Sequence, residues 1–178
     1  PSAIQTITQL KSQGMETVLL SGDNTSAAQK VGTEIGMSRV IAEVLPEEKA
    51  AIITQLKAGG YKVAMVGDGV NDAPALATAD LGIAMGSGTD VAMETAGITL
   101  MRADPILTVD AVDVSRATYG KIKQNLFWAF VYNVVAIPLA VMGVLSPVIA
   151  GAAMAMSSVS VVLNSLLLKR WKGKGGSS

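Results

Sequence analysis

Two carboxylates and an amide lie close together after a short apolar segment: Asp68, Asn71 and Asp72. Residues 62–66 predict a buried strand, and the chain from Ala75 onward predicts a helix. Open α/β sheets bind ligands at the carboxyl ends of their parallel strands. Because Mg²⁺ takes one or two carboxylates and adds water and phosphate oxygens, these residues indicate a magnesium and phosphate site. An ordinary Asp/Asn/Gly turn explains the same residues without a ligand, so chemistry alone leaves both alternatives open.

The complete string from Gly67 to Leu76 is more specific than its separate residues. It reads Gly-Asp-Gly-Val-Asn-Asp-Ala-Pro-Ala-Leu and resembles the hinge motif of P-type ATPases, which are members of the haloacid dehalogenase superfamily. This resemblance implies that Asp68 and Asp72 serve a catalytic Mg²⁺ and that Asn71 and Asp72 support the phosphate site.

A second polar turn, Ser21-Gly22-Asp23-Asn24, follows a short apolar strand predicted at residues 17–20. A helix is predicted at residues 25–35. An Asp or Asn in this position most often caps the helix, although a helix N-terminus after a strand also binds anions. The turn resembles the Thr-Gly-Asp-Asn motif of the same family, with Ser21 in place of Thr. Because serine keeps the hydroxyl, the resemblance implies a phosphate contact by Ser21, Gly22 and Asp23.

Lys49 is unusual because it lies in the first turn of a helix that Pro46 begins. The helix dipole disfavours a cation there. An exposed lysine offset by Glu47 and Glu48 is one explanation, and a lysine directed at a bound phosphate is the other. We favour the second, because Leu45-Pro46-Glu47-Glu48-Lys49 resembles the family segment that supplies the phosphate-site lysine.

The composition limits the possible functions. The 178 residues include 14 basic and 14 acidic side chains, which gives no electrostatic indication of nucleic-acid binding. The chain contains no cysteine and no histidine, so disulfides, zinc sites of the usual ligands and imidazole catalysis are excluded within it. Alternation of strands and helices predicts an α/β fold, a partial Rossmann-like parallel sheet of the haloacid dehalogenase type.

Residues 124–168 carry no charged side chain and predict a pair of transmembrane helices. The first span is predicted at about 126–145 and the second at about 148–168, with a turn at Ser146-Pro147 and a kink at Pro138. Both ends of the pair are basic, which by the positive-inside rule places both in the cytoplasm: Lys121, Lys123, Lys169, Arg170, Lys172 and Lys174. A buried soluble helix pair is the alternative.

The spans contain polar and sulfur-bearing residues that resemble the last two helices of copper-transporting P-type ATPases. The resemblance rests on Tyr132-Asn133 and on Met154-Ala-Met-Ser-Ser158. It implies that Tyr132, Asn133, Met154 and Ser158 are intramembrane metal ligands or their close supports. A thioether suits Cu(I). The alternative for Met is gap filling, and the alternative for Ser and Asn is interhelical hydrogen bonding. Zinc-transporting relatives carry a Lys and an Asp in these helices, and neither occurs here.

The resemblance covers residues 1–170 and only the C-terminal part of such a pump. We expect residues 1–115 to complete a cytoplasmic phosphorylation domain, 116–168 to form the end of a stalk helix and two membrane spans, and 169–178 to be a flexible tail. The implied cofactors are Mg²⁺ and ATP, and the cargo is Cu⁺ or Ag⁺. Implied partners are the rest of the pump with its nucleotide-binding domain and earlier helices, the lipid bilayer and a copper donor protein, without nucleic acid.

The segment Asp-Lys-Thr-Gly-Thr, which carries the phosphorylated Asp in this family, does not occur in the chain, nor does Cys-Pro-Cys. We therefore expect the chain alone to be inactive. Alternative functions are a membrane-anchored phosphatase of the haloacid dehalogenase type, and an inactive truncated pump or interaction subunit.

Overall fold

The computed structural model describes residues 2–86, 89–143 and 146–170. The chain divides into two compact units, Pro1–Val109 and Asp110–Ser178, and each is described by itself. Of the residues predicted above, Leu145 of the first span and Lys172 and Lys174 of the tail lie outside the described residues.

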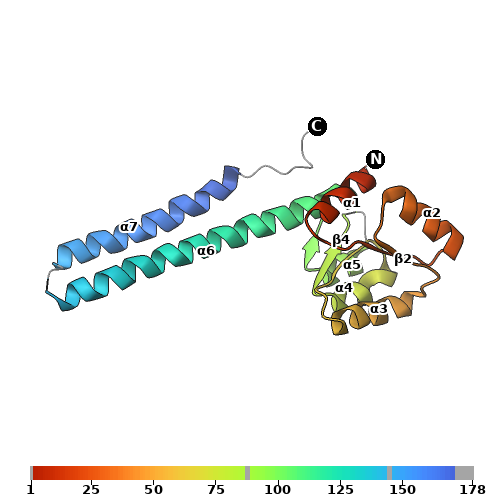
Figure 1. Ribbon diagram of the computed structural model, residues 1–178, viewed down its shortest axis with the longest axis horizontal. Helices are drawn as coiled ribbons and strands as arrows, with labels where there is room; N and C mark the ends of the chain where they lie inside the picture. Colours follow the sequence, from red (N-terminus) through yellow and green to blue (C-terminus); the bar gives the residue numbers. More distant parts are fainter. Residues whose placement is uncertain (1, 87–88, 144–145, 171–178) are drawn as a thin grey trace. The chain divides into compact units, whose positions relative to one another are not determined.

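The first unit alternates helices with short parallel strands (Figure 1). Strand β1 pairs in parallel with β2, and β3, β4 and β5 form a second parallel sheet in that order. The predicted parallel α/β fold is therefore confirmed. The elements are α1 (Ser2–Ser12), β1 (Val18–Leu20), α2 (Thr25–Ile35), β2 (Arg39–Ile41), α3 (Pro46–Ala58), β3 (Ala64–Gly67), η1 (Val70–Asp72), α4 (Ala73–Thr78), β4 (Leu81–Ala84), α5 (Asp90–Thr95) and β5 (Ile98–Thr99).

Local sequence signals set the ends of the helices. The Asn24 side chain accepts a hydrogen bond of 2.9 Å from the Ala27 N–H and caps α2. Gly36 ends that helix with a left-handed φ of 78°. Pro46 begins α3, and the Glu48 carboxylate accepts the Leu45 N–H at 2.9 Å. The first turn of α3 is thus closed by its own third residue, as in a capping box.

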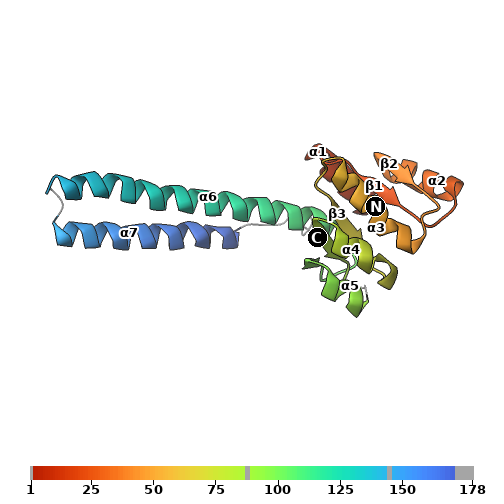
Figure 2. The same cartoon turned by 90° about the horizontal axis from the view of Figure 1, so that it is seen from below.

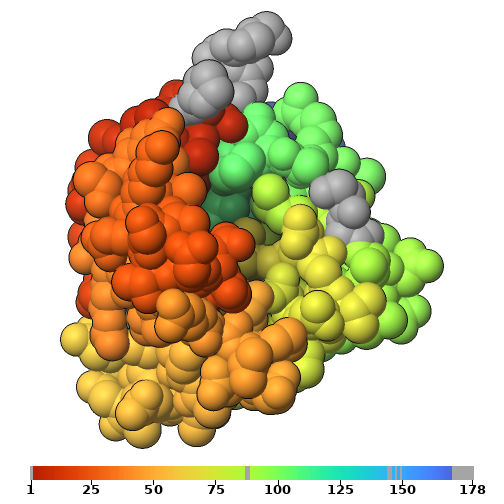
Figure 3. Space-filling model, turned by 90° about the vertical axis from the view of Figure 1, so that its right-hand side faces the viewer, coloured from red at the N-terminus to blue at the C-terminus, as the bar shows by residue number. Residues whose placement is uncertain are grey.

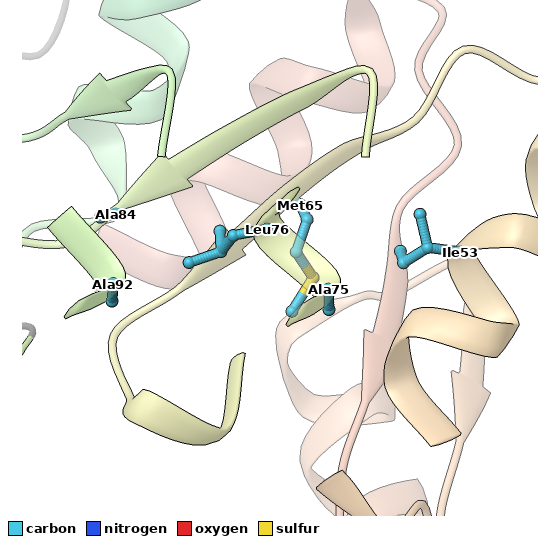
Figure 4. Packing of buried hydrophobic residues seen from close by; sticks show 6 residues of the cluster. All are labelled: Ile53, Met65, Ala75, Leu76, Ala84 and Ala92. Carbon is cyan, nitrogen blue, oxygen red and sulfur yellow. The ribbon is translucent and has the colours of Figure 1, made fainter. Parts of the chain in front are cut away.

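A small apolar core lies between the second sheet and the helices α3, α4 and α5. Ile53, Met65 and Leu76 are its larger side chains, and Met65 extends towards Ala75 (Figure 4). The remaining members of this core are alanines: Ala75, Ala84 and Ala92. This packing stabilises α4 and β4, and so it holds the Gly-rich turn after β3 from both sides.

Asp80 connects the end of α4 to the start of β3. Its carboxylate accepts the Val63 N–H at 3.0 Å and lies 3.3 Å from Lys62 Nζ and 3.9 Å from Lys57 Nζ. The Val63 hydrogen bond is the main cause that lowers the pKa of Asp80; desolvation opposes it, and both lysines add to it.

The second unit contains most of α6 (Ile106–Val141), all of α7 (Pro147–Leu166) and the short η2 (Leu167–Arg170). Two helices are long and apolar enough to cross a membrane, at 106–141 and 150–169. The first helix ends at Val141 rather than near 145, and Gly143 follows it with a left-handed φ of 69°. Pro138 lies inside α6, whose helical assignment continues on both sides of it. Figures 1 and 2 both show α7 running beside α6.

Candidate functional site

The Gly-rich turn begins where β3 ends at Gly67. Asp68 and Asn71 are exposed, whereas Asp72 is only 8% exposed and occupies the last position of η1. The Asp68 carbonyl accepts the Thr89 N–H at 3.1 Å, which connects this turn to the loop before α5. The two aspartates of one motif therefore have different environments, one open to solvent and one enclosed.

Lys49 of α3 forms an ion pair with Asp72 of η1. Its Nζ donates to Asp72 Oδ1 at 2.7 Å, and the side chains are only 17% and 12% exposed. The second carboxylate oxygen, Oδ2, accepts the Gly69 N–H at 3.4 Å. The alternative of an exposed lysine offset by Glu47 and Glu48 is wrong, because Lys49 is largely enclosed and pairs with Asp72.

Glycine at position 67 makes room for this carboxylate. A Cβ at Gly67 would lie 2.8 Å from the Cβ and 2.9 Å from the Oδ2 of Asp72. At Gly69 the nearest such contact is 3.7 Å, an ordinary van der Waals distance. The first glycine of the motif is therefore a steric requirement of the Asp72 position, and the second is not.

The second predicted turn is held by its own hydrogen bonds. Ser21 Oγ donates to Asp23 Oδ2 at 2.8 Å, and the Asp23 N–H donates to Ser21 Oγ at 3.2 Å. Gly22 allows close approach of the Val44 carbonyl, 3.4 Å from where a Cβ would be. All three residues lie just before α2, so the capping interpretation is correct for Asn24 and leaves Ser21 and Asp23 with a shared polar pair.

Glu43 is a residue of this region that the sequence did not indicate. Its carboxylate accepts the Thr25 N–H at 3.3 Å and the Thr25 hydroxyl at 3.2 Å, at the start of α2. Its backbone has a left-handed φ of 57°, and its N–H donates to the Asp23 carbonyl at 2.9 Å. No local pattern predicts this role, because it depends on β2 ending beside the second turn.

Figure 3 shows a hollow between the orange surface, to which the residues around α2 belong, and the yellow surface of the segment after β3. Within the described residues, no group of three or more His, Cys, Asp or Glu side chains is arranged to hold a metal ion. Two open hollows elsewhere on this unit, of about 800 and 280 Å³, are lined by residues of α2 and of α1 with α2, and neither includes a predicted site residue.

In the second unit the predicted metal ligands have different exposures. Tyr132 is half-buried, whereas Asn133, Met154 and Ser158 are exposed, Met154 by 72%. The Asn133 amide donates to the Ala129 carbonyl at 2.8 Å, and the Ser158 hydroxyl donates to the Met154 carbonyl at 3.2 Å. Both polar groups are thus satisfied within their own helices, and the described contacts do not bring the four residues together.

A parallel α/β sheet with this Gly-rich turn defines a haloacid dehalogenase-like domain. The family model of haloacid dehalogenase-like hydrolases matches residues 1–80. The chain is 56% identical over 170 residues to a protein of Enterococcus hirae described as a probable copper-importing P-type ATPase A, covering 94% of this chain and 23% of that protein. It is also 56% identical to the copper-exporting P-type ATPase of Bacillus subtilis (strain 168), covering 93% and 21%.

Solved structures give the same assignment. A zinc-transporting PIB-type ATPase in the E2·Pi state matches 93% of this chain and 27% of its own, with a TM-score of 0.87 and 38% identity. The catalytic domain of the CPx-ATPase CopB-B matches 57% of this chain and 40% of its own, with a TM-score of 0.54 and 39% identity. The chain belongs to the PIB-type P-type ATPases. It spans less than a quarter of the length of these copper-pump relatives.

Proposed function

We propose that this chain is the C-terminal part of an ATP-driven pump that exports Cu(I), and that it supplies the magnesium and phosphate site and part of the intramembrane metal site. The observation that carries the choice of metal is the run of residues 124–168, which has no charged side chain and offers only neutral donors. Its 56% identity to proteins described as copper pumps supports the same choice.

The phosphate site combines one open carboxylate with one enclosed ion pair. The exposed Asp68 and the Asn71 amide at the end of β3 are hard oxygen donors suited to Mg²⁺, which would neutralise charge on a phosphoryl group. Lys49 holds a positive charge for the phosphoryl oxygens, and Asp72 orients it through the 2.7 Å bond. Direct binding of Mg²⁺ by Asp72 stays a prediction; Lys49 occupies Oδ1, so the ion would bind through Oδ2, which has only the 3.4 Å bond from Gly69.

Ser21 and Asp23 complete the proposed phosphate site from the other turn. The Ser21 hydroxyl donates to Asp23 in this structure, and it can turn to donate to a phosphate oxygen instead. A Cβ at Gly22 would lie 3.4 Å from the Val44 carbonyl oxygen, so the backbone of the turn passes close to that carbonyl. ATP and the phosphorylated Asp belong to the parts of the pump that this chain does not contain.

The proposed copper site uses Tyr132, Asn133, Met154 and Ser158. A monovalent soft ion gains from the Met154 sulfur and needs little charge compensation. A divalent ion would enter a low-dielectric region without any carboxylate from these two helices, at a considerable desolvation cost. The thiolates that would complete the site come from another helix of the pump.

The direction of transport is a separate part of the proposal. The relatives at 56% identity include one described as importing and one described as exporting, so identity does not decide between them. We propose export from a cytoplasm that contains the phosphorylation domain, with a copper donor protein delivering Cu(I). Uptake of ⁶⁴Cu into inside-out vesicles that contain the complete pump tests this, and loss of preloaded ⁶⁴Cu would indicate import.

ATPase activity of the complete pump under reducing conditions tests the metal. We expect stimulation by Cu(I) and Ag(I) and none by Zn²⁺ or Cd²⁺. Met154→Ala should reduce transport and metal-dependent phosphorylation together and leave phosphorylation by inorganic phosphate intact. Met156→Ala, at 63% exposure and two residues away, is the matched control. Strong Zn²⁺ activation without a Cu(I) response would contradict the proposal.

Asp68→Asn in the same pump tests the magnesium site. Removal of one charge should abolish phosphoenzyme formation from ATP, because Mg²⁺ loses its exposed carboxylate. Folding should persist, since the Asp68 side chain is exposed. Normal phosphoenzyme levels at ordinary Mg²⁺ would refute the assignment of Asp68.

A further inference from the structure

A group of polar side chains joins α6 to α7 near the charged end of the helix pair. Lys121 Nζ donates to Asn164 Oδ1 at 2.8 Å, and the Asn164 amide donates to Asn125 Oδ1 at 2.7 Å. The Asn125 amide in turn donates to Ser165 Oγ at 2.9 Å. Gln124 Oε1 accepts longer bonds of 3.4 Å from Lys121 and Asn164. We call these five residues the polar clamp.

The clamp lies at one end of a regular seam between the helices. The half-buried residues recur at spacings of three and four on both helices, which is the pattern of packed helix faces. On α6 they include Lys121, Asn125, Ala129, Tyr132, Ala136 and Leu139. On α7 and η2 they include, in the reverse order that an antiparallel pair requires, Leu168, Asn164, Ser160, Ser157, Ala153 and Ala150.

The half-buried residues of the two helices have the same spacing, so each seam residue of α6 has a counterpart at the same depth on α7 or η2. Starting from the bonded pair Asn125 and Asn164, seven residues towards the turn lead to Tyr132 on α6 and to Ser157 on α7. Because the helices are antiparallel, the residue after each seam position turns to the same flank of the pair. Asn133 and Ser158 therefore share that flank, about 3 Å apart along the helix axes.

We propose that the polar clamp fixes the register of α6 and α7 and thereby positions Tyr132, Asn133 and Ser158 within about 3 Å of one another in depth. This inference rests on the proposed function, in which those three residues serve the transported metal. The clamp residues do not touch the metal; they are positioning residues that act through the helix register. A slip of one helical turn would displace Tyr132 from Ser158 by about 5.4 Å.

Hydrogen-bonding geometry explains why this register is preferred. Asn125 and Asn164 each use both ends of the side-chain amide, as donor and as acceptor. After a slip of one turn, Asn125 would meet Ser160 or Leu168 of the seam, and the Lys121 bond to Asn164 would be lost. Amides without partners are costly in an apolar environment, so the clamp specifies one alignment where the apolar seam residues would tolerate several.

Cross-linking of the full 178-residue chain in lipid vesicles tests the register, because the chain contains no cysteine of its own. The aligned pair is Ala136→Cys with Ala153→Cys, and the pair shifted by about one turn is Ala136→Cys with Ala150→Cys. A short bifunctional thiol reagent should join the aligned pair faster. Asn125→Leu with Asn164→Leu should reverse or abolish this preference, whereas Ser160→Ala, whose hydroxyl bonds the Met156 carbonyl of its own helix, should not.

The complete pump gives the second measurement. Asn164→Leu should raise the Cu(I) concentration for half-maximal activation by roughly 3- to 15-fold, the range expected for one or two lost interhelical hydrogen bonds. Phosphorylation by inorganic phosphate should not change. An unaltered cross-linking preference in the double variant overturns the clamp, and altered cross-linking with an unaltered Cu(I) response overturns its positioning role. A parent pump without any Cu(I) response refutes the proposed function instead, and the cross-linking result still decides the register.

Discussion

The enclosed ion pair between Lys49 and Asp72 makes a quantitative prediction about the stability of the first unit. Lys49→Met leaves the Asp72 carboxylate, at 12% exposure, with only the 3.4 Å bond from Gly69. Removal of one partner from a buried pair costs about 3–5 kcal/mol. Because 17% of the Lys49 side chain and 12% of Asp72 still reach solvent, we expect a smaller cost, about 2–3 kcal/mol.

The decisive comparison is with the double variant. Asp72→Asn keeps the size and one acceptor oxygen but removes the negative charge, so Lys49→Met with Asp72→Asn buries no unpaired charge. The double variant should therefore be more stable than Lys49→Met alone, with a coupling energy of about 1.5 kcal/mol or more between the two positions.

Hydrogen exchange, measured by mass spectrometry on the full chain in detergent, reports the stability of the segments around the Lys49–Asp72 pair. The peptides that cover α3 and the segment from β3 to β4 should exchange faster in Lys49→Met and recover protection in the double variant. Lys62→Met is the control, because the Lys62 side chain is 91% exposed in its pair with Asp80 and should change protection little. Additive effects of the two substitutions, or unchanged protection in Lys49→Met, would refute the interpretation of an enclosed, coupled pair.

Three further predictions concern the Gly-rich turn, the Asp80 carboxylate and the topology of the helix pair. Gly67→Ala should displace Asp72 and destabilise the turn by about 1–3 kcal/mol in thermal unfolding, whereas Gly69→Ala should not; equal melting temperatures would contradict this. Asp80→Asn should lower the melting temperature at pH 7 but not near pH 2. Because the pKa of Asp80 is lowered on folding, its carboxylate stabilises the fold above the pKa of the unfolded chain, and this stabilisation is lost as the pH falls through the pKa of the folded chain. The same difference in melting temperature at both pH values would contradict this. A cysteine at Ser146 should react with an impermeant thiol reagent from outside intact cells; labelling only after lysis would refute the hairpin topology.

Features that depend on a few neighbouring residues were predictable from the sequence. The N-cap at Asn24, the start of α3 at Pro46 and the end of α2 at Gly36 follow from local hydrogen bonding and backbone preference. The charge-free run 124–168 predicted the two long apolar helices by length alone. The first of them ends at Val141, earlier than predicted, because hydropathy continues past the point where the backbone leaves the helix.

Features that depend on distant residues were not predictable in the same way. The position of Lys49 is unusual because a cation is disfavoured near a helix N-terminus. Its partner, Asp72, lies in another element, so the local sequence does not identify the pair. Glu43 reaches the start of α2 only because β2 pairs with β1. Asn125 and Asn164 are 39 residues apart in the sequence, and only the antiparallel arrangement of the helices brings them together.

The two aspartates of the Gly-rich turn show how one motif produces two roles. Asp68 and Asp72 have the same carboxylate, yet Asp68 is exposed and Asp72 is enclosed beside Lys49. In the proposed function, a phosphoryl group that approaches this edge of the sheet meets a lysine that is already oriented, because Asp72 has restricted its rotamers before the ligand arrives. The entropy of ordering a long side chain is then lost on folding rather than on phosphoryl transfer. In the same proposal the exposed Asp68 is the carboxylate that binds Mg²⁺, so the two aspartates of the motif have separate tasks.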